Sequence, residues 1–184
     1  MSRADLTVRP IVRDKALAWL RQHRHLPPPR NAWLLGASVY ERDRICAVAT
    51  VERPARMAQD GVTACVSRLC TDRTEHAASK ALAAVTRACF ALGYRRVLSY
   101  TLLGEAGTCY LAAGWVITGL VKASQGWHSR AGRTVTQGGP KVRWEIGPDA
   151  KPADGAAALV AGMCIGRIEI AEHHDVLPLF AGAA

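Results

Sequence analysis

The stretch from His76 to Leu92 restricts the fold more than any other part of the chain. Its apolar residues recur every three or four positions, which is the period of a helix that buries one face. That face consists of Ala78, Ala81, Leu82, Val85, Cys89 and Leu92. Gly93 follows, as a left-handed cap residue commonly follows a helix. Because such a helix must pack on a partner, and strand-like segments flank it, we expect it to cover a β-sheet.

The remaining segments predict the other elements and their order. Strands are expected at 6–8, 33–40, 45–51, 62–69, 95–102, 115–121 and 142–146, and helices at 14–24, 76–92 and 105–113. Consecutive strands come first, and strands then alternate with helices. This order is typical of a mixed α/β fold, with one sheet that carries helices on both faces. Residues 124–140 are polar and contain glycine, so they predict a long loop.

Length and composition limit the domain organisation. A chain of 184 residues suits one domain with an appended tail. Residues 147–161 are rich in Pro, Gly and Ala, so we expect a domain at 1–148 and an extension at 149–184 that forms an extra strand or a flexible tail. No apolar run reaches the ~18 residues of a membrane span, and the first ten residues do not resemble a secretory signal. We therefore expect a cytoplasmic protein without membrane contact, either a monomer or a homodimer.

Cysteine spacing and net charge narrow the function classes. Six cysteines without any CxxC pair favour buried free thiols in a reducing compartment, and no metal site is predicted from them. The 24 Lys and Arg residues exceed the 15 Asp and Glu residues, which gives a net charge of +9. That charge suits a nucleotide cofactor or nucleic acid. It is explained equally well by solubility alone.

The segment from Cys70 to Ser79 joins a predicted strand to the amphipathic helix. The first turn of a helix has free backbone N–H groups and the positive end of the helix dipole, so a phosphate chain can bind there. Small residues such as Ala77 and Ala78 let the backbone come close to a ligand, and Arg73 adds a charge for phosphate oxygens.

On these residues the chain resembles the GNAT superfamily of N-acyltransferases. The pyrophosphate signature of that family is Arg or Gln, two residues, Gly, one residue, then Gly or Ala; Arg73, His76 and Ala78 take the three fixed places here. His76 departs from the family glycine, and its side chain narrows the approach of the backbone to CoA. A second segment, Tyr110 to Trp115, is similar to the family's Leu-Tyr-Glu-Lys-Leu-Gly-Phe stretch.

The resemblance covers residues 5–146 and carries several expectations. It implies a GNAT fold with a mostly antiparallel sheet, splayed central strands, and acetyl-CoA or another acyl-CoA as cofactor. It also implies an amine acceptor and a carbonyl oxygen held by backbone N–H groups of the splayed fourth strand. The implied cofactor-binding residues are Arg73, Thr74, His76, Ala77, Ala78 and Ser79.

A narrower likeness points to a phage- and prophage-encoded GNAT-like subfamily, similar to the Mom-type proteins that modify adenine in phage DNA. It rests on the segments 23–25, 68–72, 93–97, 100–102, 112–115 and 141–145. This likeness implies a nucleobase of phage DNA as the acceptor, by analogy, because a fold does not fix a function.

Three residues are candidates for catalysis. Tyr110 matches the family position whose hydroxyl protonates the leaving thiolate, although it could equally be a packing aromatic. Glu105 follows the fifth strand, at a strand end where ligands gather, and could act as a base or merely favour a helix start. His23 could act as a base, contact substrate or bind a metal; with His25 it could also be simply exposed at a helix end, since i, i+2 residues do not share a helix face.

Substrate contacts are expected mainly from the long loop. Aromatic and basic side chains alternate there, as suits stacking on bases and contact with phosphates, although a solvated loop explains them as well. Arg68, in a predicted strand, needs a partner and could form a structural ion pair instead. The expected substrate-binding residues are His25, Arg68, Tyr100, Trp127, His128, Arg130 and Arg133.

The leading hypothesis is therefore an enzyme that moves an acetyl-type group from CoA to an amine, including amines of phage DNA. One alternative is an acetyltransferase of small molecules or proteins. The other is a GNAT-like module that binds nucleic acid without catalysis, because His76 replaces a glycine and the predicted loop is basic.

Overall fold

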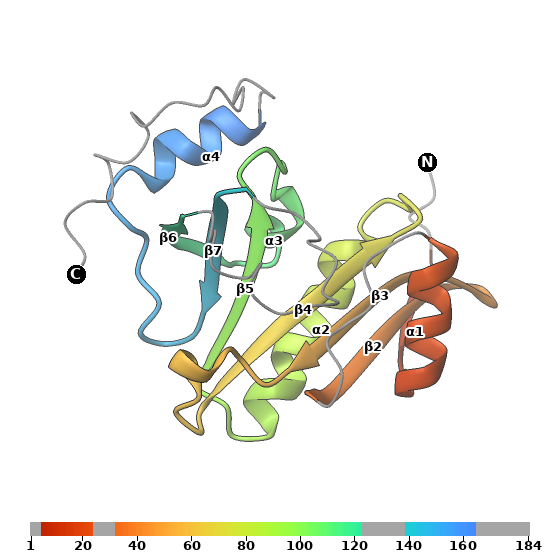
Figure 1. Ribbon diagram of the computed structural model, residues 1–184. Helices are drawn as coiled ribbons and strands as arrows, with labels where there is room; N and C mark the ends of the chain where they lie inside the picture. Colours follow the sequence, from red (N-terminus) through yellow and green to blue (C-terminus); the bar gives the residue numbers. More distant parts are fainter. Residues whose placement is uncertain (1–4, 24–31, 123–138, 165–184) are drawn as a thin grey trace, which may run out of the picture.

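The computed structural model describes residues 5–23, 32–122 and 139–164. These residues form seven strands, four α-helices and one short 3-10 turn, η1 (Figure 1). The strands are β1 (Leu6–Pro10), β2 (Trp33–Glu41), β3 (Arg44–Glu52), β4 (Thr63–Thr71), β5 (Arg96–Leu102), β6 (Val116–Val121) and β7 (Lys141–Ile146). The helical elements are α1 (Arg13–Gln22), η1 (Arg56–Ala58), α2 (Ala77–Ala91), α3 (Thr108–Ala112) and α4 (Ala156–Cys164).

All seven strands belong to one sheet, in the order β1-β2-β3-β4-β5-β7-β6. Strands β4 and β5 pair in parallel, and every other neighbouring pair is antiparallel. The helix α2 makes the crossover that a parallel pair requires. The predicted mixed, mostly antiparallel sheet is therefore confirmed.

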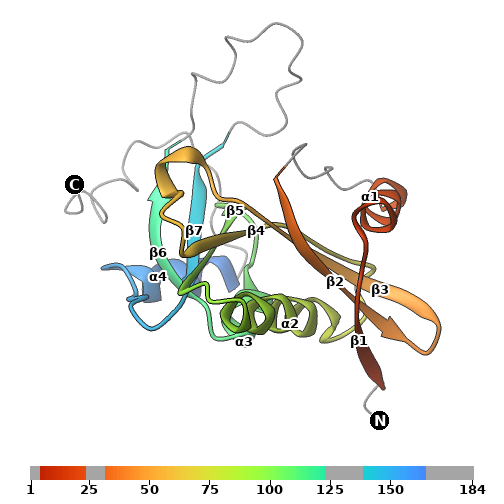
Figure 2. The ribbon, with the colours of Figure 1, turned by 90° about the horizontal axis from the view of Figure 1, so that it is seen from below.

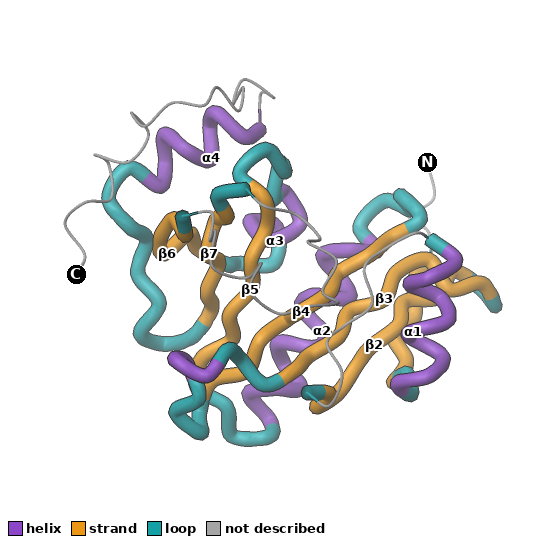
Figure 3. Tube along the Cα trace, in the orientation of Figure 1, coloured by secondary structure: helices purple, strands orange, loops and turns teal. Residues whose placement is uncertain are grey.

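Helices cover both faces of the sheet (Figure 2). Helix α2 and the short helix α3 lie on one face, and α1 lies on the other (Figures 2 and 3). The larger apolar cluster, which includes Ala81, Leu82 and Val85 of α2, packs against inward residues of the strands. A smaller cluster joins Trp19 and Leu20 of α1 to the opposite face.

Helix α2 buries most of the predicted apolar face. Ala81, Leu82, Val85 and Cys89 are fully buried against the sheet. Leu92 is 68% exposed, so its assignment to this face was wrong. The reason is that the helix ends at Ala91, so Leu92 lies in the turn after the helix and does not follow its buried face.

Two element boundaries differ from the prediction in ways that affect the site. Strand β4 continues to Thr71 instead of ending at residue 69, because it stays paired with β3 through Thr71. Helix α3 begins at Thr108 rather than at Glu105. Glu105 instead belongs to the turn after β5, where its N–H group donates to the carbonyl of Leu102.

The chain beyond residue 148 contains helix α4 (Ala156–Cys164), where we expected an extra strand or a flexible tail. Ala156 of α4 is buried in the larger cluster, and Leu159 and Val160 pack against it. The N–H group of Ala153 donates to the carbonyl of Ile117 in β6 at 2.9 Å. The boundary at 148 stays a prediction. Over the described ranges, no helix combines the length and hydropathy that crossing a bilayer requires.

Candidate active site

The central parallel strands separate towards their carboxyl ends. Pairing between β4 and β5 is limited to Thr63–Val66 on one strand and Arg96–Ser99 on the other. Strand β4 then continues for five residues and β5 for three, without a ladder between them. Figure 1 shows the two strands diverging beyond this point. The predicted splay of the central strands is therefore present.

A β-bulge in β4 lies where the splay begins. Opposite β3, Val66 pairs with Val51 and Arg68 pairs with Thr50, so Ser67 is the extra residue. A bulge bends its strand and increases the local twist. Because Ser67 directly follows the last residue that pairs with β5, the bulge accounts for the divergence of the two strands.

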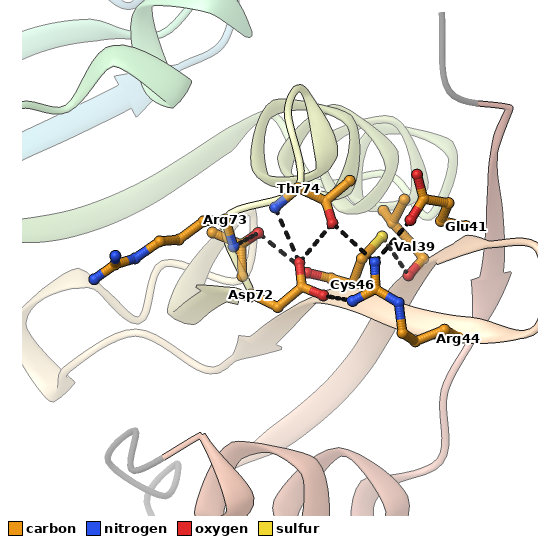
Figure 4. Close-up of polar contacts among 8 residues, drawn as sticks. Val39, Glu41, Arg44, Cys46, Asp72, Arg73 and Thr74 are labelled. Atoms are coloured by element: carbon orange, nitrogen blue, oxygen red, sulfur yellow. Dashed lines mark hydrogen bonds and ion pairs between the residues drawn. The ribbon is translucent and has the colours of Figure 1, made fainter.

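The loop from β4 into α2 is fixed by side chains (Figure 4). The Asp72 carboxylate accepts hydrogen bonds from the Thr74 N–H group at 3.0 Å and the Thr74 hydroxyl at 2.7 Å. It also pairs with Arg44 of β3, which in turn contacts Glu41 at 2.7 Å. Burial opposes ionisation of Asp72, but the Thr74 hydrogen bonds and the Arg44 charge outweigh it and lower the pKa of Asp72.

Two residues of this loop adopt left-handed backbone conformations, Arg73 with φ 77° and His76 with φ 62°. This region costs a side-chain-bearing residue free energy that glycine avoids. His76 occupies the place of the first signature glycine, so the conformation explains why the family motif has glycine there. The His76 side chain is 63% exposed, so it does not fill the space in front of the first turn of α2.

The start of α2 has the unpaired groups that an anion requires. Within the described residues, the N–H groups of Ala78 and Ser79 have no hydrogen-bond acceptor, and His76 provides no side-chain cap. The exposed Arg73 side chain extends away from Asp72 and Arg44 (Figure 4), and its guanidinium has no partner in the described part of the chain. These groups combine free donors, the helix dipole and an exposed positive charge.

The other two predicted cofactor residues contribute differently. Ala77 is fully buried, and its N–H group donates to the Thr74 carbonyl at 3.2 Å. Thr74 is held by Asp72, so its hydroxyl shapes the loop. Of the six predicted residues, Arg73 and His76 have exposed side chains, and Ala78 and Ser79 have N–H groups without an acceptor among the described residues.

Tyr110 of α3 lies under the point where β4 and β5 separate. Its hydroxyl is 2.8 Å from the Ser99 hydroxyl, which donates to the Val66 carbonyl at 3.0 Å. Because the single Ser99 proton is used on Val66, Tyr110 must be the donor to Ser99. The ring stacks on Trp144, and burial raises the pKa of Tyr110 well above its usual range.

Glu105 and His23 lie in separate places. The Glu105 carboxylate accepts a hydrogen bond from the Leu102 N–H group at 2.9 Å and closes the turn after β5. His23 stacks on Trp19, and its Nδ1 atom lies 2.9 Å from the Trp19 carbonyl oxygen. A carbonyl only accepts, so Nδ1 of His23 carries a proton.

His23 also lines a hollow of about 370 Å³ between the end of α1 and the β4–α2 loop. The other lining residues are Trp19, Gln22, Arg44, Ile45 and Asp72. The structure thus brings His23 near the loop that carries the GNAT-like signature, on the face of the sheet that α1 covers.

Two predicted substrate residues lie on the strands that diverge. Arg68 follows the bulge in β4, and burial lowers its pKa while the charge of Glu52 raises it. Tyr100 is 41% exposed on β5 and follows Ser99, the last residue paired with β4. The remaining predicted substrate residues lie outside the described residues; they are His25, Trp127, His128, Arg130 and Arg133. In the described part of the chain, no group of three or more His, Cys, Asp or Glu residues could hold a metal ion.

The sequence analysis did not single out Glu52, the last residue of β3. It is 2% exposed, although it ends an otherwise apolar strand next to Arg53 and Pro54. The sequence offers one weak signal, a carboxylate directly after the run from Ala47 to Val51. Such a residue more often marks the exposed end of a strand, so only the packing of β3 against β4 reveals its burial.

The comparisons with known proteins bear on the fold. No protein-family model matches the chain, and neither does any curated protein. Among solved structures, an N-acetyltransferase from Staphylococcus aureus Mu50 matches with a TM-score of 0.58 at 13% identity, over 78% of this chain and 98% of that one. An acetyltransferase from Bacillus subtilis in complex with CoA matches with a TM-score of 0.55 at 10% identity, over 78% and 99%.

A GNAT family acetyltransferase from Elizabethkingia anophelis with acetyl-CoA bound matches with a TM-score of 0.53 at 11% identity, over 79% of this chain and 99% of that one. Identities this low show the fold alone. The fold of the chain is that of the GNAT acetyltransferases, as its sequence resemblance predicted. The narrower likeness to phage Mom-type proteins stays a prediction.

Proposed function

We propose that this chain is an acyl-CoA-dependent N-acyltransferase that moves an acetyl-type group to an amine. The observation that carries the proposal is the splay of β4 and β5, which opens beside a loop with unpaired N–H donors and a free arginine. Similar folds among acetyltransferases with CoA or acetyl-CoA bound support it.

The described residues divide the work of such a reaction. The thioester supplies the activated acyl group. Arg73 and the N–H groups of Ala78 and Ser79 hold the pyrophosphate, which needs several donors and a positive charge. Backbone N–H groups of β4 at the splay stabilise the oxyanion. Tyr110, protonated because burial raises its pKa, is the proposed proton donor to the leaving thiolate.

Binding of acetyl-CoA tests the proposal directly. A ligand at ~100 times its Kd stabilises the folded state by roughly 2.7 kcal/mol, which a thermal melt detects. Arg73→Ala should weaken this shift, because it removes a phosphate-binding charge. Arg87→Ala is the matched control, since Arg87 is an exposed arginine further along α2. A melt that does not respond to acetyl-CoA would refute the function.

Within this function, an amino group of a nucleobase is the acceptor that we propose to examine first. The net charge of +9 and the sequence likeness to Mom-type proteins support it. Mass spectrometry of nucleosides from DNA co-expressed with the protein should detect an acylated base. Acetylation of small amines or proteins would leave the nucleosides unaltered. A binding module without catalysis would hold DNA with steep salt dependence and ignore acetyl-CoA.

A further inference from the structure

Glu52 is a buried carboxylate beside the splay. It is 2% exposed, and among the described residues its Oε1 atom has no hydrogen-bond partner. A buried polar atom without a partner costs free energy, roughly 1–3 kcal/mol or more for a charged group. Such an atom in a folded protein calls for a reason, and binding or catalysis is a common one.

The register places Glu52 on the sheet face opposite α2. Side chains alternate along a strand, and the preceding Val51 is buried in the cluster that α2 covers. Glu52 pairs with Cys65 of β4, one residue before Val66, where pairing with β5 ends. Its side chain therefore belongs to the face on which His23 and α1 lie.

Ser67 links the bulge to Glu52. Its hydroxyl is 3.0 Å from the Thr50 hydroxyl, and Ser67 favours the ionised form of Glu52. Ser67 is the extra residue at which β4 leaves β5. Among the described residues, Oε1 of Glu52 is left without a hydrogen-bond partner.

The charges around Glu52 are those of its neighbours on α1 and β4. Burial raises the pKa of Glu52, while the Ser67 hydrogen bond and the positive charges of Arg68 and Arg13 oppose the rise. Cys65 adds no charge at neutral pH, because burial and the Glu52 charge raise the pKa of its thiol to about 12. A carboxylate in this setting is a stronger base than one in water.

We propose that Glu52 receives the acceptor's amine and acts as the general base. The assignment rests on the proposed function. A charged acceptor such as ethylammonium gives one proton to Glu52 and becomes a nucleophilic amine. Its nitrogen forms a bond to the acyl carbon, the carbon–sulfur bond breaks, Tyr110 protonates the departing thiolate, and the second proton that the nitrogen loses restores the Tyr110 hydroxyl. Glu52 then releases its proton to water. The amino group of a nucleobase is already neutral, so Glu52 instead takes the proton that this nitrogen loses on attack.

The other two candidate bases are less suited to this role. The Glu105 carboxylate is occupied by the Leu102 N–H group in the turn after β5. His23 faces the hollow next to Arg44 and Asp72, and its side-chain hydrogen bond among the described residues is to the Trp19 carbonyl, away from the bulge. Glu52 lies next to the bulge in the β3–β4 ladder, and in the described part of the chain its Oε1 atom has no hydrogen-bond partner.

The test substitutes two buried glutamates, and we expect the two variants to give opposite results. Glu52→Gln removes the base but keeps the shape. Glu145→Gln changes a 7% exposed glutamate of β7 whose Oε1 atom is 3.0 Å from Arg143 Nε, so it removes an ion pair instead. Both proteins are melted with and without acetyl-CoA. Free thiol released from acetyl-CoA is then measured with ethylamine as the probe acceptor, across a range of pH.

We expect Glu52→Gln to slow ethylamine-dependent thiol release by about 10²–10⁴-fold. Its Tm should still rise on addition of acetyl-CoA, and without ligand it should melt no lower than the wild type. Its rate should no longer rise with pH, because that rise comes from titration of the base. Glu145→Gln should melt at a lower temperature and keep the wild-type rate. Glu52→Asp, which keeps the charge one methylene further back, should show a reduced kcat with the pH rise retained.

The outcomes separate the two proposals. If the wild type does not bind acetyl-CoA, the proposed function fails. If it binds acetyl-CoA but releases thiol no faster than Glu52→Gln, the assignment of Glu52 is overturned while the cofactor site stands. Should Glu52→Gln fail to fold, a Glu52→Asp protein with wild-type kcat would overturn it equally.

Discussion

Replacing His76 by glycine tests two proposals: that the backbone at His76 is strained, and that the loop before α2 binds the cofactor. His76 has φ 62°, a region that costs a residue other than glycine about 1–2 kcal/mol. Glycine also makes the unfolded chain more flexible, which costs about 0.4–1 kcal/mol. The ion pair between His76 and Glu75, at 3.4 Å, joins two exposed side chains and contributes little. His76→Gly should therefore stabilise the protein by about 0.5–1 kcal/mol.

Arg42→Gly is the matched control, because Arg42 has φ 56° in the exposed turn between β2 and β3. We expect a similar gain there, and a rise in Tm of about 2–4 °C per kcal/mol for a chain of this size. Urea unfolding and thermal melts measure both. His76→Ala should give no gain, since it keeps the strained backbone and a Cβ atom.

Acetyl-CoA distinguishes the two glycine variants. Removing the His76 side chain lets the backbone approach a phosphate more closely, so His76→Gly should bind acetyl-CoA more tightly in calorimetry. Arg42→Gly should bind as the wild type does. Two glycine variants that are both less stable than the wild type would refute the strain argument. Weaker binding by His76→Gly would show instead that the imidazole contacts the cofactor.

Three further predictions concern other parts of the molecule. Tyr110→Phe removes the donor to Ser99, so urea unfolding should show that the free energy of unfolding falls by about 1 kcal/mol. We also expect kcat to fall while KM for acetyl-CoA stays unchanged. An unchanged kcat would make Tyr110 a packing residue. The folded-state pKa of Asp72 is lowered, so its contribution to stability is present above the unfolded pKa and lost as pH falls through the folded pKa. Acid titration of unfolding should therefore be shallower in Asp72→Asn, and equal slopes would count against the Asp72 contacts. Gly36→Ala would place a Cβ atom 2.7 Å from Trp33 Cη2. We therefore expect thermal melts to show that the protein is less stable by about 1–3 kcal/mol. An unchanged Tm would mean that the Trp33 ring moves aside without cost.

The sequence contains enough local information to predict most elements and part of the site. The period of 76–92 predicts α2 because a helix with one apolar face has few other places to pack. Arg73, His76 and Ala78 are neighbours in sequence at a strand–helix junction, so the junction and the resemblance of these residues to the GNAT signature together predict a ligand-binding turn at the start of that helix. Tyr110 is predicted from a contiguous motif in the same way.

What the sequence could not supply is the position of residues that meet only through the sheet. The helix limit at Ala91, which exposes Leu92, depends on where the last turn packs. Glu52 becomes a candidate base because β3 pairs with β4 at Cys65, beside the bulge. Its burial and its place beside the bulge at Ser67 arise from strand register, and register joins residues whose separation in sequence carries no periodic signal. Local patterns thus determined the strands, the helices α1 to α3 and the turn that we predict to bind phosphate, whereas tertiary pairing alone decided which carboxylate lies at the splay.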